Sequence, residues 1–521
     1  MNSLDYIVVV VYLVLLIGMG YCFKGQTSKD DYFLGGRTLS WQPLTLSVMA
    51  TQLSAISFIS APAFVGLREG GGMIWLSYEL GVPLAMILLL ATIIPKLYRS
   101  GVISIYDYLE QRFSVSSRLL ISLVFQLSRA FATGIMVYAV SVILQGTLGI
   151  EIWQSILLTG VITVLYSLQG GMKAVVYGDA IQLVLIILGT MIFAGFGLYY
   201  LGGFDAFVDK LDPTRLTAIK ADSWGVSGDS FGLLPMIFGG VVLYASYYGC
   251  DQTQAQRSLA AKDEKNLKIM LLANGFARFP ITLLYCFTGI VIGTLAFTTP
   301  EFMAQIPADN PDWMMPVFML NYLPNGVIGL LVVAILAAAM SSLSSAINSL
   351  AAVTIEDYCR FTGKELTQSQ YLSTAKYTSF FWGVITLTLS LYAGGIAPTI
   401  IEAINKVGSV FYGPILGVFL LAVVTKRVGA KAVNLALLSG VVGNLIVSVT
   451  LPDVFWFWWN FIGLSITLFV AFAVTHLIPN MKLPEPEKSE YQHILTWKDS
   501  FMMLAAFIAM LAICFTLPLL V

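Results

Sequence analysis

Three serines inside a long apolar stretch have the spacing of a cation site. Ser341, Ser344 and Ser345 lie three and four residues apart, so on a helix their hydroxyls share one face. Ala338 and Ser342, also four apart, share an adjacent face. Hydroxyl and carbonyl oxygens grouped away from water suit a small hard cation such as sodium. The alternative is that each hydroxyl donates to a carbonyl of its own helix and only eases packing.

A carboxylate in another apolar stretch favours the ion-binding interpretation. Asp179 lies about one turn into the apolar segment 175–202. A carboxylate at membrane depth is costly, so such a residue is by default a functional candidate. We therefore expect Asp179 to supply a charged ligand beside the serines.

The composition indicates the environment of these side chains. Of 521 residues, 58% are hydrophobic and only 11% are charged, whereas soluble domains carry about 25% charged residues. A water-soluble protein is therefore excluded. A formal net charge of −1 without a long basic run excludes a nucleic-acid partner. The five cysteines are scattered without metal-ligand spacing, and no nucleophile–base constellation is present. We expect neither an enzyme nor a bound cofactor.

The apolar segments are long enough to cross a bilayer as helices, at about 20 residues each. The expected fold class is an all-α integral membrane protein with about 14 transmembrane helices. The segments lie at about 5–23, 41–62, 73–97, 117–147, 153–167, 175–202, 232–250, 267–298, 317–353, 370–395, 402–424, 430–450, 454–478 and 498–520.

The Lys and Arg residues between the segments predict their orientation, because cytoplasmic connections are enriched in them. With the N-terminus outside, the odd-numbered connections hold twenty of these residues and the even-numbered ones hold four. We expect a multi-pass protein of the plasma (inner) membrane with both termini outside. Arg257 counts among the twenty, whereas Arg129, Arg278, Lys376 and Lys406 fall in or near helices.

Two segments differ from ordinary lipid-facing helices. Residues 46–62 contain several hydroxyls and an amide, and residues 238–252 have glycines and tyrosines in place of aliphatic side chains. One interpretation of both segments is close helix packing through small residues. The interpretation we favour is a pair of interrupted helices in two inverted halves. Segments two to six and seven to eleven number five each, so the second set enters from the opposite side of the membrane. The expected organisation is 1–40 (first helix and connection), 41–202 (first repeat), 203–231 (external loop), 232–424 (second repeat) and 425–521 (three C-terminal helices).

Four motifs together resemble the sodium:solute symporter family, which includes sodium/glucose, iodide, multivitamin, monocarboxylate and sialic-acid transporters. The resemblance covers nearly the whole chain. The motifs, in chain order, are DYFLGGR at 31–37, YSLQGGMKAV at 166–175 leading to Asp179 and Gln182, QRSLAAK at 256–262, and the serine run at 341–349.

This resemblance implies sodium as the coupling ion, at two sites. The first site would consist of the carbonyls of Ala50, Leu53 and Ala338 with the hydroxyls of Ser341 and Ser342. The second, found in members that use two ions, would consist of Asp179, Ser341, Ser344 and Ser345. The extra serine of the second site argues for two sodium ions per substrate.

The resemblance also implies substrate-binding positions. These are Gln52, Ser54, Ser57, Glu79, Tyr247, Arg278 and Asn405. Glu79 and Asn405 resemble hydroxyl-binding positions of sugar carriers. Arg129 points to a different cargo, because an arginine at membrane depth can clamp a carboxylate bidentately. The alternative for Arg129 is a structural pairing with Glu79 or Glu402.

The expected function is sodium-coupled symport of a small polar solute by alternating access. The expected cargo is an organic acid, such as a sugar acid resembling sialic acid or a monocarboxylate. A neutral sugar is the alternative cargo. A membrane solute sensor that does not transport is a remote alternative, because the internal connections are too short for an output domain. Sodium, the solute and the lipid bilayer are the expected partners, and no obligatory protein partner is evident.

Overall fold

The computed structural model describes residues 2–23, 25–26, 28–53, 55–308, 310–393, 399–477 and 494–519, and within these ranges the fold is helical. The longer helices are α1 (Ser3–Cys22), α3 (Trp41–Gln52), α4 (Ala55–Gly66), α5 (Gly81–Ala91), α8 (Val115–Leu148), α9 (Ile152–Leu201), α11 (Leu233–Cys250), α13 (Glu264–Thr298), α16 (Val327–Thr362), α17 (Gln368–Ser390), α18 (Ile400–Val424), α19 (Ala430–Thr450), α20 (Trp458–Leu477) and α21 (Trp497–Thr516). Short helices connect them: α2 (Lys29–Leu34), η1 (Gly35–Arg37), η2 (Met73–Leu80), α6 (Ile93–Arg99), α7 (Ile105–Arg112), α10 (Phe204–Lys210), η3 (Pro213–Leu216), α12 (Gln252–Leu259), α14 (Pro300–Met303), η4 (Pro311–Trp313), α15 (Met314–Tyr322) and η5 (Leu517–Leu519).

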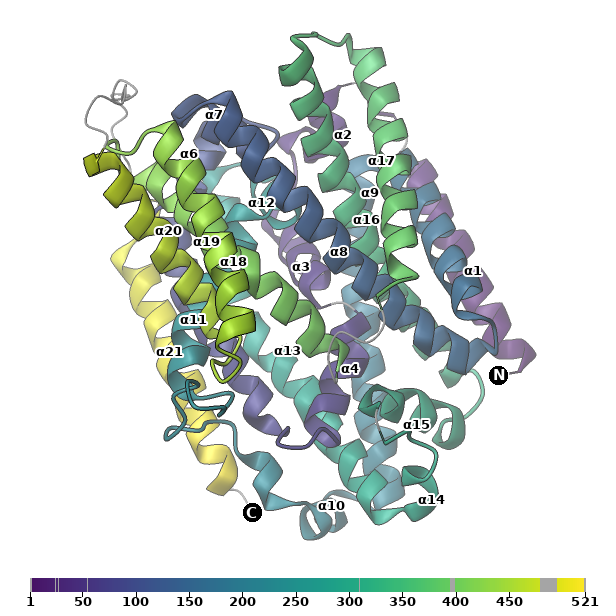
Figure 1. Cartoon of the computed structure of the whole chain (residues 1–521). Coiled ribbons are helices and arrows are strands. Elements are labelled where there is room, and N and C mark those ends of the chain that lie inside the picture. Colours follow the sequence, from purple (N-terminus) through teal and green to yellow (C-terminus); the bar gives the residue numbers. More distant parts are fainter. Residues whose placement is uncertain are drawn as a thin grey trace.

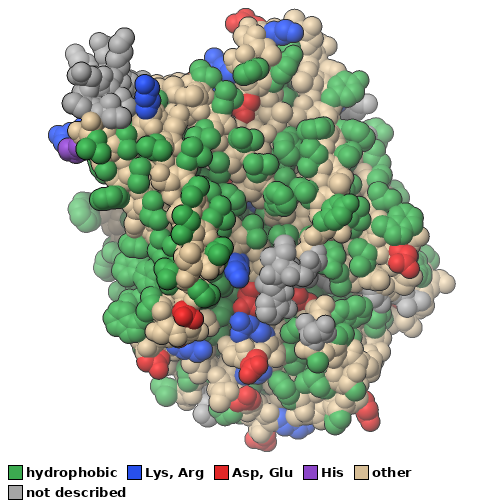
Figure 2. All heavy atoms as spheres, in the orientation of Figure 1, with side chains coloured by type: hydrophobic (Ala, Val, Ile, Leu, Met, Phe, Trp, Pro, Cys, Tyr) green, Lys and Arg blue, Asp and Glu red, His purple; other side chains and the backbone are tan. Residues whose placement is uncertain are grey.

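The helices have the length and composition of a multi-pass membrane protein. Within the described residues, 11 helices are long and apolar enough to cross a membrane, or 12 if α3 and α4 form one bent span. Every expected segment falls at least partly on a helix, but the count of fourteen crossings stays a prediction. Much of the molecular face in Figure 2 is covered by hydrophobic side chains, and charged side chains gather mainly toward its upper and lower ends.

The expected segments 153–167 and 175–202 form one helical run that is broken at a single residue. Gly171 in α9 has φ +53° and ψ −152°, which is not helical. A Cβ on this glycine would lie 2.7 Å from the carbonyl oxygen of Tyr32. Both the backbone conformation and the close approach of α2 therefore require glycine here.

The expected ninth segment, 317–353, is displaced toward the C-terminus. Its first residues belong to the separate helix α15, and the long helix α16 runs from Val327 to Thr362. Pro324 and Gly326 separate the two helices, and Gly326 has φ +88°. Hydropathy alone missed this break because the residues on both sides are apolar. The expected external loop, 203–231, likewise contains α10 and η3.

The first expected interruption lies between α3 and α4. The helix α3 ends at Gln52, Leu53 is not helical, and the axes of the two helices meet at a bend of 53°. The last four carbonyls of a helix lack partners within it. The break therefore frees carbonyl oxygens at the end of α3 for other ligands.

The second interruption lies further along the chain than the glycine and tyrosine pattern indicates. The stretch up to Cys250 is a continuous helix, α11. Asp251 is extended, with φ −96° and ψ 121°, and its side chain accepts a hydrogen bond from Thr253 N at the start of α12. The break is thus one residue with an N-cap, while the glycines of α11 allow close packing. Gly240, for example, packs against Gly81.

The buried centre of the molecule is α16, whose side chains from Leu331 to Val353 are all buried. It packs against α9, α8, α17 and α1. Figure 1 shows α2, α6 and α7 at one end of the bundle, and α10, α14 and α15 at the other end, toward which both termini lie.

Candidate functional site

The residues expected at the first sodium site meet where α3 is interrupted. Ser342 on α16 donates a hydrogen bond from Oγ to the carbonyl oxygen of Thr51 at 3.4 Å, and both side chains are buried. Ala50 and Leu53 flank this contact on the chain, and Ala338 lies one turn before Ser342 on the same helix. The structure therefore brings freed carbonyls of α3 beside the serines of α16. Occupancy of this site by sodium stays a prediction.

Asp179 lies in the centre of a dense hydrogen-bond cluster. Its Oδ1 accepts from Ser341 Oγ at 2.6 Å, and its Oδ2 accepts from Ser47 Oγ at 2.5 Å. The Asp179 side chain is completely buried. Thr51 Oγ1 lies 3.5 Å from Asp179 Oδ2 and 3.4 Å from Ser345 Oγ. The carboxylate on α9 therefore joins α3 to the serine face of α16, as expected for a site built from these residues.

Arg257, which the topology argument counted as a cytoplasmic charge, is instead buried beside Asp179. Its side chain is 1% exposed, and its Nη2 lies 2.7 Å from Asp179 Oδ2. The same Nη2 donates to Ser345 Oγ at 2.5 Å, and Nε donates to Ser47 Oγ at 2.6 Å. The positive-inside count missed this residue because α12, although polar, folds back into the bundle. A guanidinium thus lies beside the carboxylate of the expected second sodium site.

The two remaining serines of that site differ in their contacts. Ser344 donates to the carbonyl oxygen of Ser341 at 3.0 Å, which is the packing role considered as the alternative. Ser345 contacts both Arg257 and Thr51. The cluster around Asp179 therefore includes Ser341 and Ser345 directly, while Ser344 bonds to its own helix.

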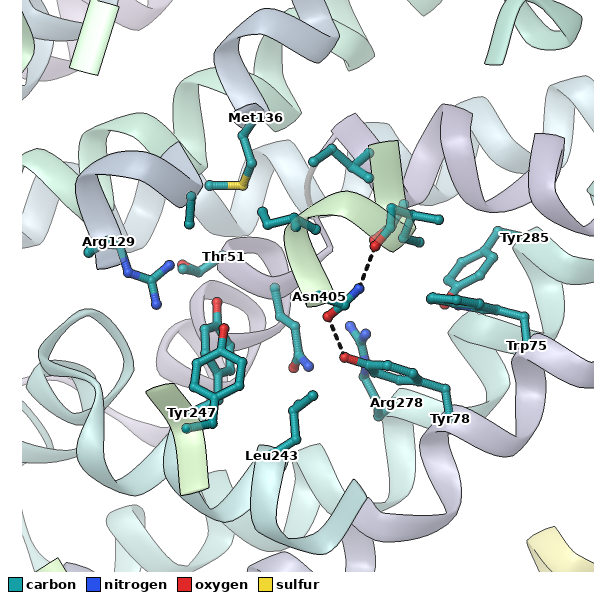
Figure 3. Close-up of a pocket in the computed structure, with 17 residues that line it drawn as sticks. Thr51, Trp75, Tyr78, Arg129, Met136, Leu243, Tyr247, Arg278, Tyr285 and Asn405 are labelled. Atoms are coloured by element: carbon teal, nitrogen blue, oxygen red, sulfur yellow. Dashed lines mark hydrogen bonds between the residues drawn. The ribbon is translucent and has the colours of Figure 1, made fainter. Parts of the chain in front are cut away.

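A cavity of about 680 Å³, counting the part open to solvent, lies beside the two interruptions. Figure 3 shows Arg129 at one end of it, Arg278 with Tyr78 and Trp75 at the other, and Asn405 between them. Six of the expected substrate residues line the cavity, namely Gln52, Ser57, Arg129, Tyr247, Arg278 and Asn405. Ser54 lies outside the described residues.

Arg129 has an ion-pair partner that neither sequence alternative named. Its Nη2 pairs with Oδ2 of Asp251, the residue that separates α11 from α12. The guanidinium carbon also lies 5.4 Å from the ring centroid of Tyr247, within range of a cation–π contact. The Nε of Arg129 has no hydrogen-bond partner among the described residues. Glu79 and Glu402 are occupied elsewhere, so a structural pairing of Arg129 with either of them is wrong.

Glu79 lies behind the cavity wall instead of in it. Its carboxylate accepts from Tyr244 OH at 2.8 Å, from Thr282 Oγ1 at 2.8 Å, and from Arg278 Nε at 3.1 Å to each oxygen. Arg278 lines the cavity, and its Nη1 has no partner among the described residues. The described contacts of Glu79 thus position Arg278.

A third arginine–carboxylate pair lies beside a residue that lines the cavity. Arg68, just after α4, donates from Nη2 to Glu402 Oε1 at 2.7 Å and from Nε to Oε2 at 3.0 Å. Ile401, the neighbour of Glu402 in α18, lines the cavity. Three arginine–carboxylate pairs, Arg129–Asp251, Arg278–Glu79 and Arg68–Glu402, thus lie at or beside the cavity.

Apart from Tyr247, the aromatic residues that line the cavity were not predicted from the sequence. Trp75, Tyr78, Tyr285 and Tyr412 all line it. Tyr78 OH donates to Asn405 Oδ1 at 2.6 Å and stacks on Trp75 with ring centroids 5.0 Å apart. The sequence feature that could have indicated Tyr78 as a cavity residue is its position directly before Glu79. In such an apolar chain, aromatic residues are too common for that signal to be specific.

Comparisons with known proteins show what the chain as a whole is similar to. A model of the sodium:solute symporter family matches residues 32–443. The human sodium/iodide cotransporter is 30% identical over 462 residues, covering 85% of this chain and 69% of that protein. A Drosophila melanogaster protein described as a putative sodium-dependent multivitamin transporter is 30% identical over 483 residues, covering 88% of this chain and 75% of the relative.

A solved structure shares the fold. The structure of a sodium-coupled sialic acid symporter, described as substrate-bound and outward-open with a novel sodium site, has a TM-score of 0.82 at 25% identity. The match covers 93% of this chain and 100% of the solved one. The family and these relatives are sodium-coupled transporters and not enzymes, with sodium as the coupling ion. The matched region includes every residue of the cation cluster and the cavity, and the chain therefore belongs to the sodium:solute symporter family.

Proposed function

We propose that this protein is a sodium-driven symporter of a small organic anion, bound in the cavity between the two interrupted helices. The observation that carries this proposal is the presence of two arginines that line one cavity, one toward each end of it. Arg129 and Arg278 each pair with a carboxylate, and each keeps one nitrogen without a partner among the described residues. Buried donors without partners are costly, so a ligand that accepts from both would be stabilised.

The carboxylates beside these arginines leave the cavity close to neutral. Asp251 offsets Arg129, and Glu79 offsets Arg278. An organic anion would therefore enter without a large excess of positive charge, and its binding would depend on hydrogen-bond geometry. A planar carboxylate suits the fork of a guanidinium better than a point cation such as Lys. A monocarboxylate or a sugar acid has the required group.

A neutral sugar is the second candidate, and a specific contact favours it. Asn405 and Gln52 line the cavity, and each accepts a hydrogen bond from a phenol, Asn405 from Tyr78 and Gln52 from Tyr248. Such groups recognise hydroxyls. We prefer the anion because one nitrogen of each guanidinium has no partner among the described residues, whereas the amide oxygens of Asn405 and Gln52 already accept hydrogen bonds.

Two sodium ions are proposed to drive each cycle. Site one would comprise Ala50, Leu53, Ala338, Ser341 and Ser342. Site two would comprise Asp179, Ser341, Ser344 and Ser345, with Arg257 displaced from the carboxylate when the ion binds. Two ions moving inward at about −100 mV down a tenfold gradient supply about 7 kcal/mol. Transporting one negative charge inward costs about 2 kcal/mol of this, and the remaining ~5 kcal/mol corresponds to accumulation of about 5,000-fold.

Alternating access is proposed to use two inverted repeats of five spans, residues 41–202 and 232–424. Each repeat begins with one of the two interrupted helices. Both termini and the loop 203–231 would face the outside of a plasma (inner) membrane. The lipid bilayer is then the environment of the apolar face, and residues 425–521 add three helices to the repeats.

A ligand screen by thermal shift tests the choice of cargo. Purified protein is heated with pyruvate, N-acetylneuraminate or glucose, each with sodium or with choline, because a ligand of the folded state raises the melting temperature. We expect sodium-dependent stabilisation by at least one of the acids and none by glucose. Sodium-dependent stabilisation by glucose alone would favour the neutral sugar.

A further inference from the structure

The helix α12 is polar and yet fully buried. All eight of its residues are buried, and six of them are polar. It packs against α16 and α3 and also against α2, α6 and α7, which lie at one end of the bundle (Figure 1). Polar side chains are rarely buried without a specific use, because losing water costs free energy unless hydrogen bonds replace it.

The polar side chains of α12 face a polar stripe on α16. Ser341, Ser345, Asn348 and Ser349 share one face of α16, at positions i, i+4, i+7 and i+8. Thr253 Oγ1 lies 2.9 Å from Ser349 Oγ.

Two further contacts extend this stripe along α12. Gln256 Nε2 donates to Asn348 Oδ1 at 3.5 Å, and Arg257 reaches Ser345. We call the set of Thr253, Gln254, Gln256, Asn348 and Ser349 the polar seam. It adjoins the Asp179 cluster through Arg257 and Ser345 and follows α16 toward its end at Thr362.

Two atoms of the seam lack partners although they are buried. Gln254 Nε2 donates to the carbonyl of Val48 at 3.3 Å, but Gln254 Oε1 has no hydrogen-bond partner among the described residues. The same holds for Asn348 Nδ2. Both residues are at most 2% exposed. Buried groups of this kind usually bind water or an ion.

We infer that sodium leaves the Asp179 site through the polar seam, where the unpartnered groups of Gln254 and Asn348 each bind the partly hydrated ion in passing. The inference rests on the proposed sodium symport. Gln254 Oε1 would ligate the ion, and Asn348 Nδ2 would donate to a water that travels with it. The hydroxyls of Thr253 and Ser349 are adjacent oxygen ligands.

The ligands of the seam suit transient binding of a sodium ion better than tight binding. The ligands of the seam are neutral, whereas the adjoining Asp179 site has a carboxylate. An ion held only by neutral oxygens is bound weakly enough to leave, which a conduction path requires. The seam leads to the end of α16 followed by residues 363–367, the side that the Lys and Arg distribution assigns to the cytoplasm.

Separate measurements of net uptake and exchange test this role. Net uptake into sodium-free proteoliposomes requires sodium release at every cycle. Exchange of labelled for unlabelled substrate, with saturating sodium on both sides, does not. The probe is radiolabelled pyruvate or N-acetylneuraminate, whichever the unmodified protein takes up with sodium. Asn348→Leu and Gln254→Leu remove the polar groups and keep similar volumes.

We expect each variant to lower net uptake by at least 10-fold while exchange and the half-maximal sodium concentration for thermal stabilisation change less than twofold. Asn274→Leu is the matched control, since Asn274 is a buried α13 residue that also has an unpartnered oxygen. It should preserve the ratio of net uptake to exchange. Should Asn348→Leu fail to fold, Asn348→Ala replaces it.

Three results would overturn the inference. Equal losses of net uptake and exchange would indicate a structural role, and unchanged net uptake in both variants would remove the seam from the ion path. An unmodified protein that takes up neither acid with sodium would refute the proposed function itself. Failure of the proposed function is distinguishable from failure of the inference about the seam, because it is measured on the unmodified protein before any variant is made.

Discussion

Arg257 and a sodium ion should compete for Asp179. The guanidinium Nη2 lies 2.7 Å from Asp179 Oδ2 in a site almost without exposure to solvent. For charge centres about 4 Å apart and an effective dielectric constant of about 20, the attraction is about 4 kcal/mol. A sodium ion that replaces the guanidinium must overcome this attraction, which corresponds to at most about 10³-fold in ion affinity.

The variant Arg257→Gln tests this competition. Without sodium, removing one partner of a buried pair leaves Asp179 uncompensated, which costs about 3–5 kcal/mol of stability. With sodium, the ion no longer competes with a fixed cation. We expect a lower melting temperature in choline chloride and a half-maximal sodium concentration for stabilisation that falls at least 10-fold. Ionic strength is kept constant with choline, so that screening does not contribute.

Arg118→Gln is the matched control. Arg118 is also completely buried, and it pairs with Asp107, Glu110 and Asp357, the last of which lies twelve residues beyond Ser345 on α16. Its loss should lower stability and leave the sodium concentration dependence unchanged. If Arg257→Gln left the half-maximal sodium concentration unchanged or raised it, sodium would not replace Arg257 at Asp179.

Three further predictions follow from the same contacts. Ser342→Ala should raise the half-maximal sodium concentration at least 10-fold and abolish coupled uptake, whereas Ser141→Ala should change neither, because Ser141 bonds only to its own helix. Arg129→Lys keeps the charge beside Asp251 but loses the fork, so it should raise the apparent KM for the organic acid about 10-fold at nearly unchanged stability; a change in stability alone would argue against anion binding. Burial raises the pKa of Asp107, in the short helix α7, to about 6, and nearby Arg118 offsets this only in part. The free energy of unfolding should therefore be higher at low pH and fall as the pH rises through 6, and Asp107→Asn should flatten this dependence in melting curves between pH 4 and 7.

The cation cluster was predictable in part because its ligands follow helical spacing. Ser341 and Ser345 share a face at any position of a helix, and an isolated carboxylate such as Asp179 has few roles in a membrane other than a functional one. The interruption after Gln52 was indicated by the density of polar side chains. These features depend on local sequence, and the residue pattern was therefore sufficient to predict them.

The partners of the arginines could not be predicted, because they come from distant segments. Arg129 meets Asp251 only when α8 packs beside the second interruption. Arg257 follows an apolar segment, where a basic residue normally indicates the cytoplasmic surface. The structure instead buries Arg257, because the whole of α12 is buried. The Lys and Arg count assigns a residue to one side of the membrane from its position in the sequence alone. Burial of that residue depends on the packing of helices that are far apart in the sequence.

Uptake of labelled pyruvate and N-acetylneuraminate into proteoliposomes tests the central claim most directly. The vesicles contain no sodium, and the external medium supplies a sodium gradient, a proton gradient or neither. Saturable uptake of one acid with sodium alone, increased by a negative interior potential and not inhibited by glucose, is the predicted result. Uptake on a proton gradient with sodium absent from both sides would contradict sodium coupling. Sodium-dependent uptake of glucose that neither acid inhibits would contradict the anionic cargo.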